Sequence, residues 1–351
     1  MVPSLDRVVL EWEEAPPAPH LRAFFELAEV SLDVDADEPA LLEELAAVLG
    51  RSRRETEKKA GPARHQLAAR VRARGGPGGF GHLRISTADP QARGPAELDF
   101  LMSLDSEDFP FHRVEAAPPW TSLAFRGQAE PMFALRDDDC LFALVPGWRK
   151  AVSLLLLQRV MRVRRDAVFF HAGSVAVGGR GVLIVGPKGA GKSTLALALA
   201  TRGHGLLGDE HACYVPARHE LVPFRRPVGV KPGPRARTSS AALARLGRDP
   251  DRDGMMRVPA EDLVSGTAGP VPLHAVVFLR GFAEEPRLSR VEPGREELAA
   301  LQPVGSSFAN AASTERVFQL VRLLSRAEVW DLRPGQPDDT AALVESALAP
   351  Q

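Results

Sequence analysis

The stretch "GPKGAGKST" at residues 186–194 decides the fold, because it joins an apolar segment to a helix-forming one. Before it, "GVLIV" at 181–185 is a short apolar run that predicts a buried strand. After it, "STLALALATRG" at 193–203 is rich in helix-forming residues and ends at a glycine. The spacing G-x-x-x-x-G-K-[ST] between a strand and a helix is typical of a loop that wraps around phosphate. We therefore predict a phosphate-binding loop in an α/β domain.

The residue types of this loop suit a nucleoside triphosphate. Glycines let the backbone approach phosphate closely, and the amides of the loop and of the helix N-terminus point at the anion. Lys192 is expected to reach the β- and γ-phosphates, and the Ser193 hydroxyl to ligate Mg²⁺. The cofactors predicted are ATP and Mg²⁺. The residues predicted to contact the nucleotide are Gly186, Lys188, Gly189, Ala190, Gly191, Lys192, Ser193 and Thr194.

An acidic pair follows the loop at short range. In "GHGLLGDEHACYV" at 203–215, Asp209 and Glu210 come seventeen and eighteen residues after Lys192. One short helix and one short strand fill that interval, so the acids emerge at the carboxyl end of a strand next to the loop. Ligands bind at that edge in open α/β sheets. This spacing disfavours a transporter-type ATPase, in which the acidic pair lies far downstream of the loop.

The segment "FFHAGSVAVGGRGVLIVGPKGAGKSTLALALATRGHGLLGDE" at 169–210 resembles the catalytic core of the HPr kinase/phosphorylase family. That family shares its nucleotide fold with phosphoenolpyruvate carboxykinase, so the resemblance implies a P-loop core with a mixed sheet. It also implies that Asp209 takes the proton of the acceptor hydroxyl and that His171, ahead of the strand hairpin, belongs to the catalytic site. By the same resemblance Ser193, Glu210 and Asp209 would hold the metal.

Basic residues beyond the acidic pair are candidates for neutralising a transferring phosphoryl group. "RRPVGVK" at 225–231 resembles a segment of HPr-kinase-related proteins, and this resemblance makes Lys231 a catalytic candidate. Arg225 and Arg226 precede it in the same segment. Arg257 and Arg280 are further cations of the second half of the chain.

The composition of the chain argues against several other classes of function. The 351 residues are 44% apolar and 25% charged, with a formal net charge of −1. These values are typical of a globular protein and give no drive toward nucleic acid or an anionic membrane. Cys140 and Cys213 fit neither a disulfide framework nor a metal-ligand spacing. The chain shows no secretory signal and no membrane-spanning run, so we expect a cytoplasmic protein.

Two domains are expected, a smaller α+β domain at 1–146 and a nucleotide-binding catalytic domain at 147–351. In the first, alternation predicts a strand at 29–36 and amphipathicity a helix at 38–50. Short strands of an antiparallel sheet follow at 82–86, 98–104, 122–127, 132–136 and 140–145. In the second, we predict a helix at 147–166 and a hairpin of 174–177 with 181–185, turning at Gly178-Gly179-Arg180.

Charge is unevenly distributed along the first domain. Residues 1–50 hold twelve acidic and two basic side chains, whereas residues 51–74 hold nine basic and two acidic ones. The glycine-rich "GGPGGFG" at 75–81 follows, so residues 51–80 form a basic arm with a flexible breaker. We predict a mobile arm whose positive charge complements the negative charge of residues 1–50. The alternative is a docking surface for an acidic peptide.

These observations predict an ATP-dependent kinase that transfers the γ-phosphoryl group to a hydroxyl. The acceptor is a Ser or Thr of a peptide or protein, or a small-molecule alcohol, because phosphoryl transfer chiefly requires positioning and charge neutralisation. Two alternatives stay open: a regulatory ATPase with no acceptor, and a carboxykinase-like enzyme. The sequence leaves a homo-oligomer possible.

Overall fold

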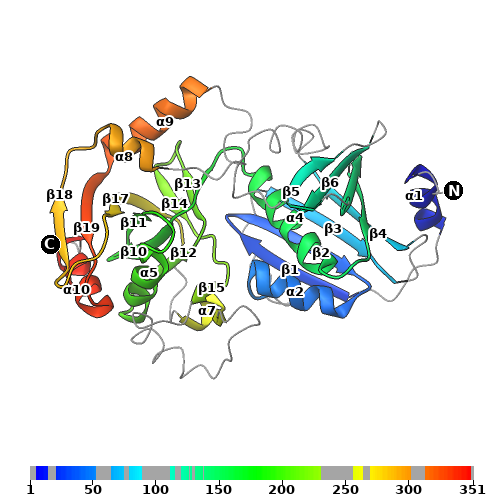
Figure 1. Ribbon diagram of the computed structural model, residues 1–351, viewed down its shortest axis with the longest axis horizontal. Coiled ribbons are helices and arrows are strands. Elements are labelled where there is room, and N and C mark those ends of the chain that lie inside the picture. The colour runs from blue at the N-terminus through cyan, green and yellow to red at the C-terminus, as the bar shows by residue number, and fades with distance from the viewer. Residues whose placement is uncertain are drawn as a thin grey trace. The chain divides into compact units, whose positions relative to one another are not determined.

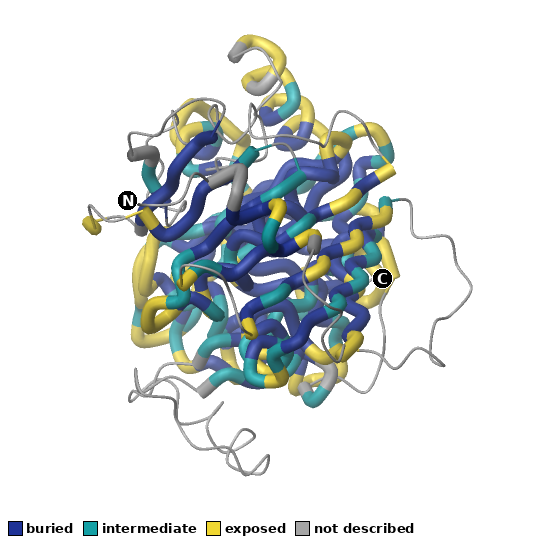
Figure 2. The backbone as a smooth tube through the Cα atoms, turned by 90° about the vertical axis from the view of Figure 1, so that its right-hand side faces the viewer, coloured by how far each residue is buried: buried dark blue, intermediate teal, exposed yellow. Residues whose placement is uncertain are grey.

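The computed structural model describes residues 5–14, 21–52, 65–74, 79–88, 111–114, 120–125, 127–128, 131–136, 138–230, 256–263, 269–301 and 313–348. The chain divides into two compact units, Met1–Arg164 and Arg165–Gln351 (Figure 1). In both units the strands are largely buried, whereas turns and the outer faces of helices are exposed (Figure 2).

The first unit is built on one sheet, whose described strands follow the order β1-β2-β3-β4-β8-β7-β6-β5. All neighbouring strands are antiparallel except β2 and β3, which are parallel. The strands are β1 (Leu21–Leu27), β2 (Val30–Ala36), β3 (His65–Arg72), β4 (Phe80–Thr87), β5 (Phe111–Val114), β6 (Thr121–Phe125), β7 (Phe133–Arg136) and β8 (Asp139–Ala143). The antiparallel sheet predicted from short strands is thus confirmed in its main part, while the predicted strand at 98–104 lies outside the described residues.

Three helices pack on this sheet in the described part of the unit: α1 (Leu5–Glu14), α2 (Pro39–Leu49) and α4 (Trp148–Val163). Helix α2 follows β2 and precedes β3, because parallel strands cannot be joined by a tight turn. Helix α4 packs against α2, β2 and β8. The unit boundary therefore falls after α4, eighteen residues beyond the domain boundary at 146 that the sequence suggested.

The prediction of a mobile basic arm is wrong for residues 65–72, because these residues form the inner strand β3. Strand β3 pairs with β2 on one side and β4 on the other. Its side chains alternate: Leu67, Ala69 and Val71 are buried, whereas Gln66 and Arg70 are exposed. The net charge concealed this alternation, which is the pattern of a strand with one face on a core. Residues 53–64 and 75–78 of the arm lie outside the described residues.

We predict that Leu67→Ala lowers the free energy of unfolding by about 2–5 kcal/mol, the usual cost of emptying a buried leucine site. Gln66→Ala, its matched neighbour on the exposed face, should change it by less than about 0.5 kcal/mol. Urea unfolding followed by tryptophan fluorescence measures both, since Trp12, Trp120 and Trp148 lie in this unit. Equal effects of the two substitutions would contradict a strand at 65–72.

The second unit is an α/β structure with a mixed sheet. The main path runs β12-β10-β11-β17-β14-β13-β9, and β19 pairs with β17 and with β18. These strands are β9 (Val168–Phe170), β10 (Gly173–Val177), β11 (Arg180–Val185), β12 (Gly205–Gly208), β13 (Ala212–Val215), β14 (Glu220–Val222), β17 (Val271–Leu279), β18 (Arg287–Arg290) and β19 (Glu328–Arg333). A separate hairpin joins β15 (Val228–Val230) to β16 (Met256–Val258), before the short helix α7 (Ala260–Leu263).

The strand directions bring several carboxyl ends to one edge of this sheet. β11 is parallel to β17, and β17 is parallel to β19. β12 and β11 are both antiparallel to β10, which lies between them, so they also run in the same direction. The segments that follow β11, β12, β17 and β19 therefore all begin at the same edge. This is the edge at which open α/β sheets bind ligands.

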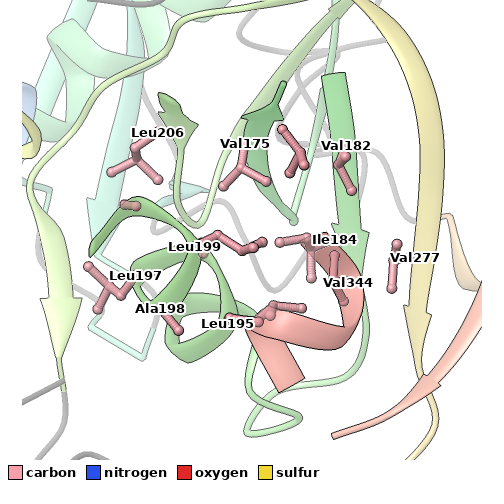
Figure 3. Packing of buried hydrophobic residues seen from close by; sticks show 14 of the residues in the cluster. Val175, Val182, Ile184, Leu195, Leu197, Ala198, Leu199, Leu206, Val277 and Val344 are labelled. Atoms are coloured by element: carbon pink, nitrogen blue, oxygen red, sulfur yellow. The ribbon is translucent and has the colours of Figure 1, made fainter. Parts of the chain in front are cut away.

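Helices cover both faces of the sheet. On one face α5 (Lys192–Thr201) and α10 (Pro337–Leu348) share an apolar cluster with Val182, Ile184 and Val277 (Figure 3). On the other face, the helices α9 (Ser313–Arg326) and α8 (Arg295–Ala300) pack on Leu183, Val185 and Phe278. Successive residues of β11 thus enter opposite cores, which explains why the strand is apolar from Val182 to Val185. Each buried leucine of α5 contributes about 1.5–3 kcal/mol relative to exposure.

Three elements that the sequence predicted after residue 146 are confirmed: the helix at 147–166 is α4, which belongs to the first unit, the hairpin is β10–β11, and the helix after the loop is α5. Both turn glycines, Gly178 and Gly179, have positive φ values, which a two-residue hairpin turn requires. Within the described residues, no helix is long and apolar enough to cross a membrane.

Candidate functional site

The loop at 186–194 connects β11 directly to α5, with Gly191 as the residue before the helix. Gly189 and Gly191 have φ values of 84° and 101°, in the left-handed region that favours glycine. At the start of the loop, a Cβ on Gly186 would lie 3.0 Å from Cβ of Leu279 and 3.2 Å from Cβ of Ala190. Glycine is therefore required both for the turns of this loop and for its close approach to the end of β17.

Lys192 is folded back over the loop. Its Nζ donates hydrogen bonds to the carbonyl oxygens of Gly186 at 2.7 Å and Pro187 at 3.2 Å. The side chain is buried, and burial lowers the pKa of Lys192 while the charges of Asp209 and Glu210 oppose that change. Ser193 and Thr194 follow in the first turn of α5 and are half-buried, whereas Lys188 and Gly189 are exposed. An ammonium group thus lies at the loop with two carboxylates nearby.

Asp209 is the buried acid of the site. It directly follows β12, and only 3% of its surface is exposed. Neither of its carboxylate oxygens has a hydrogen-bond partner among the described residues. Burial raises the pKa of Asp209 to about 6, although the neighbouring Ser193 hydroxyl favours the charged form. Unpaired buried carboxylate oxygens are costly, so this side chain is a candidate for binding a ligand.

Glu210 differs from Asp209 in its surroundings. Its side chain is 50% exposed, and its Oε2 lies 3.7 Å from Nη1 of Arg226. Its φ of 62° places it in the left-handed region, which is uncommon for a residue other than glycine. Before the pair, a Cβ on Gly208 would lie 2.6 Å from the carbonyl oxygen of His211, so the chain turns tightly around the two acids. The tight turn directs one carboxylate inward and the other toward solvent.

His211 connects the acidic turn to Arg226. Nη1 of Arg226 donates to Nδ1 of His211 at 2.8 Å. Burial, and then the charge of Arg226, lower the pKa of His211 well below its ordinary value, so the imidazole is neutral and accepts this bond. The pairing of β9 with β13 ends at Phe170 and Ala212, the neighbours of His171 and His211 in the chain, and the charge of His171 also lowers the pKa of His211. The structure therefore brings His171 to the acidic turn.

The cations proposed from the sequence have different surroundings. Arg226 lies at the acidic pair, as described, and Arg225 donates from Nε to the carbonyl oxygen of Leu206 at 3.1 Å. Arg257 pairs through β16 with Gly229 and lies near enough to Arg226 to lower its pKa, after the larger effect of burial. Lys231 lies outside the described residues. Among the described residues of this set, Arg226 is a cation on which the charges of both Glu210 and Asp209 act.

Arg280 is held by ion pairs that connect secondary-structure elements. Its Nε donates to Oδ1 of Asp331 at 2.9 Å and its Nη1 to Oε1 of Glu296 at 2.7 Å, and Nη2 contacts Glu297. These pairs join the end of β17 to β19 and α8. With three carboxylates around it, the guanidinium is engaged away from the acidic turn.

Sequence reasoning missed His211, although it directly follows Glu210. A histidine next to two acids gave no motif to match, and its bond to Arg226 depends on two segments fifteen residues apart. The signal that could have found His211 was its position in the chain. A residue next to an acid at the end of a strand lies in the same turn as the acid, and that turn forms the site.

The donors fit Mg²⁺ bound mainly through phosphates. Among the described residues no group of three or more His, Cys, Asp or Glu side chains lies close enough to hold a metal by itself. Mg²⁺ in nucleotide sites is typically held by one or two carboxylates, waters and phosphate oxygens. The unpartnered oxygens of Asp209, next to the Ser193 hydroxyl, provide donors of that kind.

Comparison with known proteins relates this chain to one family of kinases. It is 35% identical over 137 residues to an HPr kinase/phosphorylase of Aromatoleum aromaticum, which covers 37% of this chain and 44% of that protein. It is 32% identical over 154 residues to an HPr kinase/phosphorylase of Burkholderia lata, covering 42% and 48%. The chain is HPr-kinase-like. The predicted resemblance to this family is thereby confirmed, and the chain spans about half the length of the curated relatives it matches.

Two further comparisons do not strengthen the relationship to the HPr kinases. No family model matches the chain. The solved structure of the Hpr(Ser) kinase/phosphatase from Coxiella burnetii is 15% identical, with a TM-score of 0.24 over 51% of this chain and 91% of that one. That TM-score is too low to establish a common fold, so the relationship rests on the sequence matches.

We predict that Asp209→Asn stabilises the nucleotide-free protein in a pH-dependent way. A buried carboxyl whose pKa is raised from 3.8 to about 6 favours the folded state when protonated, and this stabilisation is lost as pH rises through 6. The amide cannot ionise, so the stability of the variant relative to the parent should rise by about 2.4 kcal/mol between pH 4 and pH 8. Thermal unfolding across this range measures the difference.

Glu210→Gln is the control for this experiment, because the half-exposed Glu210 side chain keeps its hydration. Its stability difference from the parent should vary much less with pH. A pH-independent effect of Asp209→Asn would show that Asp209 ionises as readily in the folded chain as in the unfolded one.

Proposed function

We propose that the chain is an ATP-dependent kinase that transfers the γ-phosphoryl group of Mg²⁺-bound ATP to a hydroxyl group. In this proposal the 186–194 loop is a P-loop, in a nucleotide fold of the HPr kinase and phosphoenolpyruvate carboxykinase type, within residues 165–351. The kinase names of the relatives support the reaction class. The observation that carries the proposal is the buried, unpartnered carboxylate of Asp209 beside Lys192 and the loop.

The first role of these residues is to bind the triphosphate. The backbone of the loop and the N-terminus of α5 offer amide donors, and a dianionic phosphate at that end is favoured by the helix dipole. Lys192 would exchange its bonds with the Gly186 and Pro187 carbonyls for phosphate oxygens. The gain is an anionic acceptor in place of a neutral one, so that both partners of the bond are charged. Mg²⁺, held by Ser193 and an acidic side chain, would supply neutralisation of the phosphate charge.

The second role is to activate the acceptor. Asp209 would accept the hydroxyl proton as the oxygen forms its bond to the γ-phosphorus and the bond to the ADP oxygen breaks. A general base works best when its pKa lies near the operating pH, and burial has moved the pKa of Asp209 to about 6. His171 lies near enough to this turn for its charge to lower the pKa of His211. In the proposed site it helps to hold the geometry around Asp209.

Arg226 completes the proposed electrostatics. Its guanidinium lies 3.7 Å from Glu210, and its bond to neutral His211 holds it in place. A fixed cation beside the acids stabilises charge that spreads over the phosphoryl oxygens during transfer. The proposed metal-assisting role of Glu210 and this role of Arg226 are compatible, because the carboxylate is half-exposed and free to turn toward the metal.

The acceptor proposed is a cytoplasmic hydroxyl-bearing protein or peptide with a reactive Ser or Thr, and a small-molecule alcohol is the other member of the class. The curated relatives are named for a protein substrate, HPr, which makes purified HPr the first acceptor to test. A library of Ser- and Thr-containing peptides is the second.

We predict that Asp209→Asn lowers the rate of label transfer from [γ-³²P]ATP to the acceptor by at least about 10²–10⁴-fold, the usual contribution of a general base. Mg·ATP affinity should persist, because the substitution removes a negative charge next to the phosphates. In the parent, the transfer rate at low acceptor concentration should rise with pH up to about 6 and then level off, as Asp209 loses its proton.

The substitution Glu210→Gln distinguishes the proposed role of Glu210 from that of Asp209. It should raise the Mg²⁺ concentration needed for transfer and be partly rescued by excess metal, since its role is to assist the ion. If the two variants behave alike, the division of roles is wrong. If the parent consumes ATP and labels none of the acceptors, the chain is a regulatory ATPase.

Lys192→Ala tests the nucleotide site itself. Loss of its charge-assisted contact to phosphate should weaken ATP binding by about 1.5–3 kcal/mol, measured by isothermal titration. Lys150→Ala, at an exposed position of α4 outside the loop, is the control and should have a smaller effect. Equal ATP affinity in the parent and Lys192→Ala would remove the assignment of the loop to phosphate.

A further inference from the structure

Helix α9, at the periphery of the second unit (Figure 1), carries three large apolar side chains that the described residues leave exposed. Val317 is 49% exposed, Phe318 69% and Val321 45%. Single exposed apolar side chains are ordinary on a protein surface, whereas a contiguous group of them marks an interaction site. The other large apolar side chains exposed in the described part of the chain are single, each on a different segment: Leu10, Leu21, Val145 and Phe282.

The apolar part of α9 is wider than its contact with the sheet. Leu320, Leu323 and Leu324 are buried in the cluster that covers this face of the sheet. Beside them lies a second row, in which residues recur at intervals of three and four, so that they share one side of the helix. We call this row the outer stripe of α9, and its exposed members are Thr314, Val317, Phe318, Val321 and Ser325. A stripe with this spacing is typical of a helix that packs against another helix.

Charged residues of both signs flank the outer stripe. Glu315 and Arg322 are both exposed and lie seven residues apart, which is about two helical turns, so they lie on the same side of the helix. Oε1 of Glu315 accepts a hydrogen bond from Nε2 of Gln319 at 3.4 Å, a contact within the same helix. Arg326, four residues after Arg322, is exposed as well. The flank is therefore negative toward the N-terminus of α9 and positive toward its C-terminus.

This order of charges makes the outer stripe complementary to itself. A two-fold contact places the same surface of each copy against the other, so a surface fits only if it matches its own rotated image. If two α9 helices pack antiparallel, Glu315 of one copy lies opposite Arg322 of the other, and the reverse pair forms as well. The two-fold axis then passes between positions 318 and 319. Phe318, with the largest exposed fraction of the three, lies at the centre.

We propose that the outer stripe of α9 is a contact between two copies of this chain, with the two helices antiparallel. This inference goes beyond the proposed function and does not depend on it. An aromatic side chain at the centre of an interface is the usual location of a binding hot spot. A parallel arrangement is disfavoured, because it would place Glu315 against Glu315 and Arg322 against Arg322. One 14-residue helix from each copy makes an interface at the low end of the size range, below about 1,200 Å² in total, so the association is weak and reversible.

Sedimentation equilibrium of the full chain tests the contact. Between about 1 μM and 1 mM, the range of weak specific complexes, the mass of the parent should rise from 37.9 kDa toward twice that value. Phe318→Ser should weaken the dissociation constant at least about tenfold, because it removes a central hot spot from both copies. Leu10→Ser is the matched control, since Leu10 is 56% exposed on α1 of the first unit, and it should associate as the parent does.

A charge exchange tests the antiparallel arrangement. Glu315→Arg alone and Arg322→Glu alone should each weaken association, because each places like charges opposite one another at both flanking positions. The double variant Glu315→Arg/Arg322→Glu restores opposite charges across the contact, so it should associate as the parent does. Circular dichroism checks that α-helix content is unchanged, and all the substituted side chains are exposed in the single chain.

Three results would overturn the inference. The first is a parent that stays at the mass of one chain over the whole concentration range, which would leave the outer stripe to a different partner. The second is a parent that associates equally well after Phe318→Ser, which would place the contact between copies elsewhere. The third is a double charge variant as weak as the single ones, which would exclude the antiparallel pairing. Kinase activity enters none of these measurements, so their failure and that of the proposed function are distinguishable.

Discussion

The parallel pairing of β11 with β17 is the interaction on which the second unit depends. Both strands are buried by helices on their two faces, so their backbone groups must be satisfied by neighbouring strands. This pairing sets Gly186 against Leu279 at the end of β17, where a Cβ on the glycine would lie within 3.0 Å of its neighbour. The start of the loop, the position of α5 and the segment that carries Phe282 all follow from the same pairing.

The site built on this edge has opposing charges that are only partly matched. Burial lowers the pKa of Lys192 and raises the pKa of Asp209, so both side chains lose part of the hydration that stabilises their charged forms. Lys192 compensates through two backbone carbonyls, whereas the Asp209 oxygens have no partner in the described structure. Such an arrangement lowers the stability of the free protein. In the proposed function it prepares the site for the charge of the nucleotide, and the lost stability is the general cost of electrostatic preorganisation.

Prediction from sequence succeeded where a pattern is local. The loop, its flanking strand and helix, and the β10–β11 hairpin were all readable from glycine positions and apolar runs, since these patterns fix backbone geometry over a few residues. It failed for β3, where basic residues suggested a mobile arm. The charges of Arg70 and Arg72 hid an alternation with Leu67, Ala69 and Val71 that becomes clear only when β2 and β4 lie on either side.

The sequence by itself determined the loop with phosphate-binding spacing, the acidic pair that follows it at short range and the likeness to the HPr kinases. These features depend on residues near one another in the chain, so local spacing was sufficient. Only the tertiary structure decided which charges meet. Arg226 lies with His211 and Glu210, whereas Arg280 is engaged by Asp331 and α8, and Phe282 lies against Gly191. The physical reason is that the partners of a side chain are set by which strands are neighbours in the sheet, and that order is decided by the packing of the whole unit.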